Sequence, residues 1–247
     1  MQLITYVINL DDNVERMQSV TTQLNALNWP FIRVPAFDGR RLELSRVAEY
    51  DPEHALSYMG RELKGGELGC YFSHLDCARR LLKSNAEYAV VLEDDMQIKP
   101  DALKVIQQAV DWLKERDLSW YLMHIASDKR KITTRLQRFA EYELLRAHYF
   151  PVTTTGLVWS RQGAQSFVSE HDTIFAPVDN YFRWWLTNNN QGLTIYPPLV
   201  IPSGAQSDIN PTPLKAGNLK KARFSQLNKQ RRLWGDKLKA LSHKWLK

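Results

Sequence analysis

The pattern of apolar and polar positions along the chain predicts strands that alternate with helices. Short apolar runs rich in β-branched residues predict buried strands at residues 3–10, 31–37, 88–92, 120–125, 154–160 and 193–196. Apolar residues at helical spacing predict helices that end near Leu27 and that cover residues 67–83, 100–115, 162–170 and 178–188. Residues 40–64 are polar and show no clear periodicity. This alternation, with several continuously apolar strands, indicates an α/β domain whose sheet is largely parallel.

Length and loop composition suggest one large domain followed by a tail. A chain of 247 residues can bury a sizeable core. Residues 202–218 are rich in Pro, Gly and Ser, which predicts a linker. We therefore expect a folded domain over residues 1–214 and a separate tail over residues 215–247.

The excess of basic over acidic residues in the protein lies in the tail. Residues 215–247 contain eleven Lys and Arg and one acid, whereas the other 214 residues hold 22 basic and 26 acidic groups. Apolar residues recur in the tail at steps of three and four, so they would share one face of a helix, which only Arg231 interrupts. They are Phe224, Leu227, Trp234, Leu238, Leu241 and Trp245. A basic amphipathic helix of this kind is typical of anionic membrane surfaces. Docking onto the domain or a partner is the alternative, and nucleic acid is disfavoured because phosphate would repel the acidic body.

Other features of the chain limit its location and its cysteine chemistry. No apolar run reaches the ~18 residues of a membrane-spanning helix. The first residues, MQLITYVINLDD, lack the basic leader of a signal peptide, so a cytoplasmic location is expected. Cys70 and Cys77 would lie ~10 Å apart on one helix, which is too far for a disulfide. We interpret both as small buried apolar residues.

Three consecutive acids end the third predicted strand. Glu93, Asp94 and Asp95 directly follow the apolar run AVVL. Ligands of open α/β sheets bind beyond the carboxyl ends of the strands, and carboxylates crowded there repel one another. Alternation along an extended chain would point Glu93 and Asp95 the same way, a pair that suits Mg²⁺ or Mn²⁺. A solvated turn is the alternative interpretation.

Six short motifs in order resemble glycosyltransferase family 25, which includes lipopolysaccharide-biosynthesis glycosyltransferases and collagen galactosyltransferases. They are VINLDDNVERM (7–17), PAFDGR (35–40), GELGCYFSH (66–74), VVLEDDM (90–96), PVDNYF (177–182), and PPLV (197–200) followed by QSDI (206–209). The resemblance implies a GT-A fold, which is a Rossmann-like, mostly parallel sheet flanked by helices, over residues 1–214. It also implies a nucleotide-sugar donor, a divalent metal held by the acidic motif, and inversion at the anomeric carbon.

The resemblance suggests roles for the carboxylates. Asp95 is the expected ligand of Mn²⁺ or Mg²⁺, Glu93 supports it, and Asp208 is a further candidate ligand. Inversion by single displacement also needs a general base, and Asp179 of PVDNYF is the candidate. A ligand of a sugar hydroxyl, or a first-turn acid that complements the helix dipole, is the alternative for Asp179.

Residues near the ends of the first strands are expected to bind the donor. They are Asn9, Leu10, Arg16, Ala36, Asp38, Gly39, His74, Glu93 and Asp94. Structural roles are the alternatives: a surface charge for Arg16, a turn for Asp38, and a core position for His74. Trp184 and Trp185 are either core residues or a platform under an acceptor sugar, and His124 is similarly ambiguous.

The sequence therefore predicts an inverting hexosyltransferase. The family implies galactose from UDP-galactose as the commonest donor, and a lipooligosaccharide or lipopolysaccharide acceptor. The basic tail would hold the enzyme peripherally on the inner face of a bacterial cytoplasmic membrane. Two other classes stay open: a metal-dependent nucleotidyltransferase or phosphohydrolase that uses the same acids, and a non-catalytic protein that binds a membrane or nucleic acid.

Overall fold

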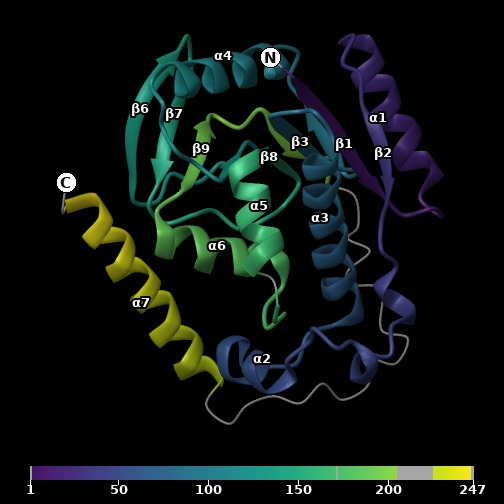
Figure 1. The fold of residues 1–247 in the computed structure, drawn as a ribbon, viewed down its shortest axis with the longest axis vertical. Helices are drawn as coiled ribbons and strands as arrows, with labels where there is room; N and C mark the ends of the chain where they lie inside the picture. Colours follow the sequence, from purple (N-terminus) through teal and green to yellow (C-terminus); the bar gives the residue numbers. More distant parts are fainter. Residues whose placement is uncertain (1, 171, 205–224, 246–247) are drawn as a thin grey trace.

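The computed structural model describes residues 2–170, 172–204 and 225–245. Within these residues an eight-stranded sheet forms the centre of the molecule, in the order β2-β1-β3-β8-β5-β9-β7-β6 (Figure 1). The strands are β1 (Leu3–Asn9), β2 (Ile32–Pro35), β3 (Tyr88–Glu93), β5 (Leu122–His124), β6 (Thr133–Phe139), β7 (Tyr142–Ala147), β8 (Gly156–Ser160) and β9 (Gly192–Tyr196).

Most strands of this sheet point the same way. β1 lies parallel to β2 and to β3, with Tyr6 opposite Ile32 on one side and Val91 on the other. β5 and β9 are also parallel, while β8 runs antiparallel between β3 and β5. β7 runs antiparallel to both β9 and β6. Of the eight strands described in this sheet, only β7 and β8 therefore run against the rest, and the predicted α/β sheet is confirmed.

Helices cover both faces of the sheet, which explains the continuously apolar strands. On one face pack α3 (Gly65–Lys83), α5 (Arg161–Glu170) and α6 (Val178–Asn189), and on the other α1 (Val14–Ala26) and α4 (Ala102–Glu115). Successive residues of a strand point to opposite faces. In β1, Tyr6 and Ile8 therefore enter the first core, while Val7 enters the second.

Several short elements were not predicted. Within the stretch judged aperiodic lie 3₁₀ helices η1 (Gly39–Arg41) and η2 (Leu44–Arg46) and helix α2 (Pro52–Met59). Asp51 caps α2 by accepting a hydrogen bond from the backbone N–H of His54 at 2.8 Å. The β6–β7 hairpin was also missed, as was a second sheet formed by β4 (Met96–Ile98) and β10 (Val200–Pro202). Most of the predicted linker lies outside the described residues.

The basic tail forms helix α7 (Ser225–Trp245), as predicted, and one of its sides packs against α2 and α6 (Figure 1). Arg232 donates to the Tyr58 carbonyl at 3.2 Å and stacks 4.3 Å above the Tyr58 ring. Ala240 is fully buried, and His243 Nε2 lies 3.1 Å from the carbonyl of Asn188. For this side of the helix, the alternative that the tail docks onto the folded domain is therefore correct.

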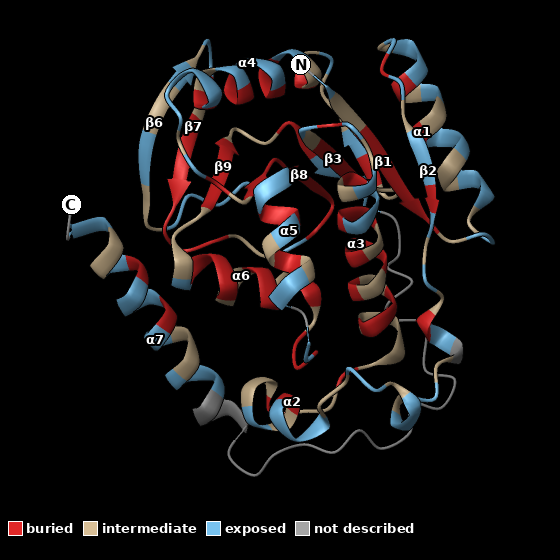
Figure 2. Cartoon of the chain, in the orientation of Figure 1, coloured by how far each residue is buried: buried red, intermediate tan, exposed pale blue. Residues whose placement is uncertain are grey.

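Another side of α7 remains exposed (Figure 2). Its apolar side chains belong to the predicted amphipathic face, and their exposed fractions are 61% for Trp234, 63% for Leu238, 37% for Leu241 and 73% for Trp245. Phe224 and the side chain of Leu227 lie outside what the structure describes. Among the described helices, none combines the length and the hydropathy needed to cross a membrane.

Candidate functional site

Strand β3 delivers its three acids to the edge of the sheet beside β1. The strand ends at Glu93, and Asp94 and Asp95 follow in a bend before β4. The predicted alternation between Glu93 and Asp95 therefore stops at Glu93, because the chain turns there. All three acids nevertheless line one cavity of about 120 Å³, at the position predicted for a ligand.

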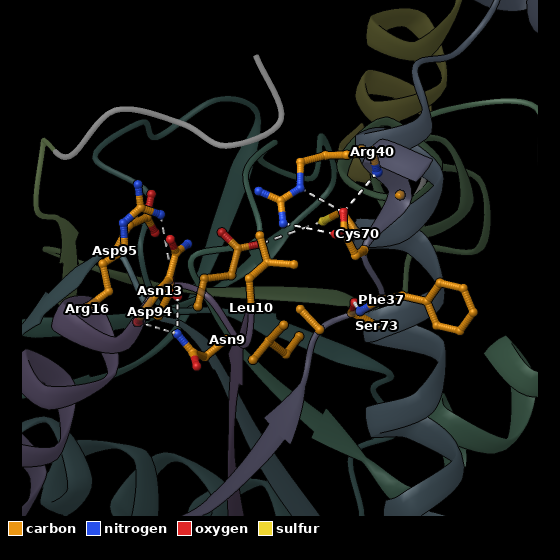
Figure 3. A pocket seen from close by; sticks show the side chains of 16 residues that line it. Asn9, Leu10, Asn13, Arg16, Phe37, Arg40, Cys70, Ser73, Asp94 and Asp95 are labelled. Carbon is orange, nitrogen blue, oxygen red and sulfur yellow. Dashed lines mark hydrogen bonds and ion pairs between the residues drawn. The ribbon is translucent and has the colours of Figure 1, made fainter. Parts of the chain in front are cut away.

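Of the residues predicted to bind the donor, all except His74 line this cavity (Figure 3). One end is lined by Asn9, Asn13, Arg16, Asp94 and Asp95, and the other by Phe37, Arg40, Cys70 and Ser73, with Leu10 between them. Asn9 Nδ2 donates to Asp94 Oδ2 at 2.6 Å, and Arg16 lies 3.5 Å from Asp94 Oδ1. Asp94 is therefore held by side chains from β1 and α1. The structure brings these residues together, while their individual roles stay predictions.

Asp95 has an unusual environment for a carboxylate. Its Oδ1 atom is buried and has no hydrogen-bond partner among the described residues. Burial, together with the charges of Glu93 and Asp94, raises the pKa of Asp95 to about 6, and the charge of Arg16 opposes this shift. A buried, unpaired carboxylate oxygen beside two other acids is destabilised unless a cation approaches it. The three acids therefore fit a hard divalent cation, which prefers carboxylate oxygens.

Three neighbouring side chains hold the carboxylate of Glu93 in place. Its Oε1 accepts a hydrogen bond from Thr154 Oγ1 at 2.7 Å, and it lies 3.4 Å from His74 Nε2 and 3.8 Å from Cys70 Sγ. Burial alone would raise the pKa of Glu93, but the hydrogen bonds from these three neighbours lower it overall. Glu93 therefore stays ionised at neutral pH, with one oxygen fixed by the protein.

The structure places His74 and the two cysteines differently from one another. His74 is fully buried and lines neither this cavity nor the second one described below, which fits its core alternative, while its role toward the donor stays a prediction. Cys77 is a buried apolar residue as predicted, whereas Cys70 is half-buried and lines the cavity. Both thiols are free, and burial raises the pKa of Cys70 well above its usual value. The ligand atoms of Cys70, His74 and Glu93 lie within 4.8 Å of one another, which is itself a spacing that suits a metal ion.

Glycines allow the far wall of the cavity to form. A Cβ atom on Gly39 would lie 1.8 Å from the carbonyl oxygen of Gly65, and one on Gly69 would lie 2.3 Å from that of Phe37. Only glycine permits this close approach to α3, which explains Gly39 of PAFDGR and Gly69 of GELGCYFSH. The contact places Asp38 at the cavity wall, where Arg40 donates to its Oδ1 at 2.8 Å.

A second cavity, of about 310 Å³, adjoins the first. Cys70 and Glu93 line both cavities and so form the wall between them. Asp179, in the first turn of α6, lines the second cavity, and its Oδ1 accepts hydrogen bonds from the backbone N–H and Nδ2 of Asn180 at 2.7 and 2.9 Å. Asp179, the candidate base, therefore lies on the other side of Glu93 from Asp94 and Asp95.

An ion pair that the sequence interpretation missed lines this second cavity. Arg61 donates to both carboxylate oxygens of Glu67, at 2.5 and 2.8 Å, and Glu67 also accepts from the backbone N–H of Lys64 at 2.7 Å. The pair therefore fixes the start of α3 and leaves a guanidinium beside Asp179. Glu67 belongs to the GELGCYFSH motif, which was the available signal, whereas nothing in the sequence singled out Arg61.

Other candidates lie away from the two cavities. Trp185 is buried among aromatic side chains and its Nε1 donates to Glu170 at 2.9 Å, so it is a core residue, whereas Trp184 is half-buried with its ring centroid 5.7 Å from that of Tyr181. His124 is buried, which lowers its pKa to about 4, and its Nε2 lies 3.1 Å from the carbonyl of Thr153. Asp208 lies outside the described residues.

The chain is similar to one family of known proteins and to several curated relatives. The model of glycosyltransferase family 25 (LPS biosynthesis protein) matches residues 2–182. A glycosyltransferase 25 family member of Aedes aegypti is 27% identical over 189 residues, covering 74% of this chain and 31% of that protein. Procollagen galactosyltransferase 2 of Homo sapiens is 25% identical over 181 residues, covering 71% and 29%. The chain thus spans about a third of the length of the curated relatives it matches.

Solved structures with a similar fold are more distant. One is a glycosyltransferase involved in the glycosylation of the major capsid of PBCV-1, with 8% identity and a TM-score of 0.44 over 83% of this chain and 95% of that chain. Another is S. aureus TarS 1–349, with 13% identity and a TM-score of 0.45 over 82% and 60%. Likenesses of this size carry no argument about activity.

Proposed function

The chain belongs to glycosyltransferase family 25, and from this membership we propose that it is an inverting, UDP-sugar-dependent hexosyltransferase. One observation carries the proposal. Asp95, one of the three acids at the end of β3, has a buried, unpaired oxygen and lines the first cavity. This cavity shares Glu93 with the second cavity, which contains Asp179. Such an arrangement has room for a charged leaving group on one side of Glu93 and an acceptor hydroxyl on the other.

Galactose is the proposed donor sugar, and a lipooligosaccharide or lipopolysaccharide glycan the proposed acceptor. The first proposal is supported by relatives named procollagen galactosyltransferases. The second is supported by the description of the family as LPS biosynthesis proteins. Both come from relatives and not from the shape of the cavity.

The side chains divide the proposed reaction between the two cavities. Asn9, Arg16 and Asp38 would hold the nucleotide in the first, with Leu10, Ala36 and Gly39 forming its walls. Asp95 and Glu93 would hold Mn²⁺ or Mg²⁺, which when bound neutralises negative charge on the departing diphosphate. In the second cavity, Asp179 would accept the proton of the acceptor hydroxyl as the new bond forms.

Product analysis tests the class of reaction. A screen of UDP-galactose, UDP-glucose and UDP-N-acetylglucosamine with Mn²⁺ is expected to give UDP, with one donor turned over fastest. A nucleotidyltransferase would release pyrophosphate, and a phosphohydrolase would release inorganic phosphate. Either of these products, with no UDP, would reject the proposed transfer.

We also propose that α7 holds the enzyme on the cytoplasmic face of a membrane. Four exposed apolar side chains lie on a helix whose described part carries six Lys and Arg and one acid. The apolar side chains would enter the interface, and each nearby cation would contribute about 1 kcal/mol against an anionic leaflet.

Vesicle sedimentation tests this membrane role. Trp234→Ser combined with Trp245→Ser is expected to reduce binding to anionic vesicles by about ten-fold, because two exposed indole rings are lost. The matched control is Val14→Ser, which removes an apolar residue that is 67% exposed on α1. Equal vesicle binding by the double variant and the wild type would contradict the proposal.

A further inference from the structure

A third cavity, of about 260 Å³, lies next to the one that contains Asp179. The two share Thr153, which lines both. The third cavity is bounded by the segment after β5, the segment before β8, helix α6 and strand β10. It is separate from the acidic cavity, with which it shares no lining residue.

Cations gather at this third cavity. Lys129, Lys131 and Arg183 line it, and Asp128 is the one acid among its lining residues. Burial lowers the pKa of Lys131, as do the positive charges of Arg183, Lys129 and Lys237. Lys237 belongs to α7, so the docked helix adds to the positive field. Like charges held together in this way favour an anion between them.

Two of these cations, Lys131 and Arg183, lie against the same aromatic ring, although Lys129 and Lys131 are exposed to solvent. Lys131 Nζ lies 5.7 Å and the Arg183 guanidinium 4.9 Å from the centroid of the buried Tyr149 ring. Arg183 also donates from Nε to the carbonyl of Phe150 at 3.2 Å, which fixes the plane of its guanidinium. Asp236 on α7 interacts with Arg183 and Arg232, and so offsets part of the charge.

The residue between the two cavities has a strained backbone. Thr153 has a φ of 86°, a region that β-branched residues rarely adopt. The buried ring of His124 holds it there, with Nε2 lying 3.1 Å from the Thr153 carbonyl and 3.2 Å from its hydroxyl. Strain of this kind persists where the surrounding structure enforces it, and it is common at ligand-binding positions.

We infer that the third cavity binds an anionic group, a carboxylate or a phosphate, that the glycan acceptor carries next to the hydroxyl being glycosylated. The inference rests on the proposed function. An acceptor whose hydroxyl reaches Asp179 in the second cavity would extend past Thr153 into the third. Lys131 and Arg183 would then bind its charge, and Tyr149 would form the floor between them. An anionic lipid headgroup offers the same chemistry but would have no reason to lie beside the candidate base.

Binding of simple sugars tests the inference without requiring transfer. The probes are methyl β-glucuronide, glucose 6-phosphate and the neutral methyl β-glucoside, titrated by ligand-observed NMR into the full chain saturated with UDP and Mn²⁺. Both anionic probes are expected to bind on the order of ten-fold more tightly than the neutral one. Lys131→Glu is expected to abolish this preference, whereas Lys104→Glu, the same charge change on an exposed residue of α4, should keep it.

Two further experiments distinguish a glycan anion from a lipid headgroup and from a damaged fold. Arg183→Gln should also lose the preference, and its thermal midpoint shows whether the fold is intact. If Lys131→Glu weakens binding to anionic vesicles more than Lys104→Glu does, while the sugar preference is unchanged, the cavity serves a lipid headgroup and the inference is wrong. Equal binding of charged and neutral sugars by the wild type would also overturn it. A chain that shows either result yet still releases UDP would leave the proposed function intact.

Discussion

Asp95→Asn is expected to lower the turnover of the UDP-sugar by on the order of 10²- to 10³-fold. The substitution keeps the size of the side chain but removes the charge that would hold a divalent cation against the diphosphate. Because Glu93 and Asp94 both repel that charge, its loss should not weaken the fold. The thermal midpoint of the variant in EDTA is expected to equal or exceed that of the wild type.

The matched control for this variant is Asp111→Asn. Asp111 is an exposed acid on α4 that lines none of the cavities described above. Turnover of the control should stay within about two-fold of the wild type, because isolated surface changes have small effects. Full turnover by the Asp95 variant would contradict the metal role of the acidic bend. A low thermal midpoint would instead assign Asp95 a structural role.

Asp179→Asn is expected to lower kcat by on the order of 10²- to 10⁴-fold and to leave the KM for the donor unchanged. The carboxamide can still accept hydrogen bonds from Asn180, so α6 should keep its first turn. It cannot take a proton from an acceptor hydroxyl. The measurement is steady-state kinetics with varied donor and varied acceptor.

Asp172→Asn is the control for this second variant, since Asp172 is an exposed acid close in sequence that lines none of the cavities. It should behave as the wild type. A higher KM with unchanged kcat for the Asp179 variant would show that Asp179 is a ligand of a sugar hydroxyl. That result would contradict its role as the base.

The periodic parts of the sequence predicted the central fold well. Strands β1, β3 and β8 are buried on both faces, so their apolar runs are continuous and easily recognised. Hairpin β6–β7 was missed because β6, with the sequence TTRLQRF, is half-exposed and mostly polar. Helix α2 was missed because it is only eight residues long, although Asp51 and Pro52 gave a local start signal.

The sequence predicted which residues line the site where these residues stand at the ends of strands. It predicted them less well where their position depends on how helices pack on the sheet. Asn9, Asp38 and the acids after β3 surround one cavity, as their positions at neighbouring strand ends suggested. The burial of His74 behind Glu93 depends on how α3 packs on the sheet, which no local pattern encodes. Arg61 lies in the aperiodic segment, so only the folded chain brings it to Asp179.

Calorimetric titration of UDP tests the central claim most directly, because it measures whether a divalent cation joins the nucleotide to the acids after β3. In Mn²⁺, the wild type is expected to bind UDP at least about ten-fold more tightly than in EDTA, and Asp95→Asn should show no such difference. Equal affinity of the wild type in Mn²⁺ and in EDTA would contradict the account.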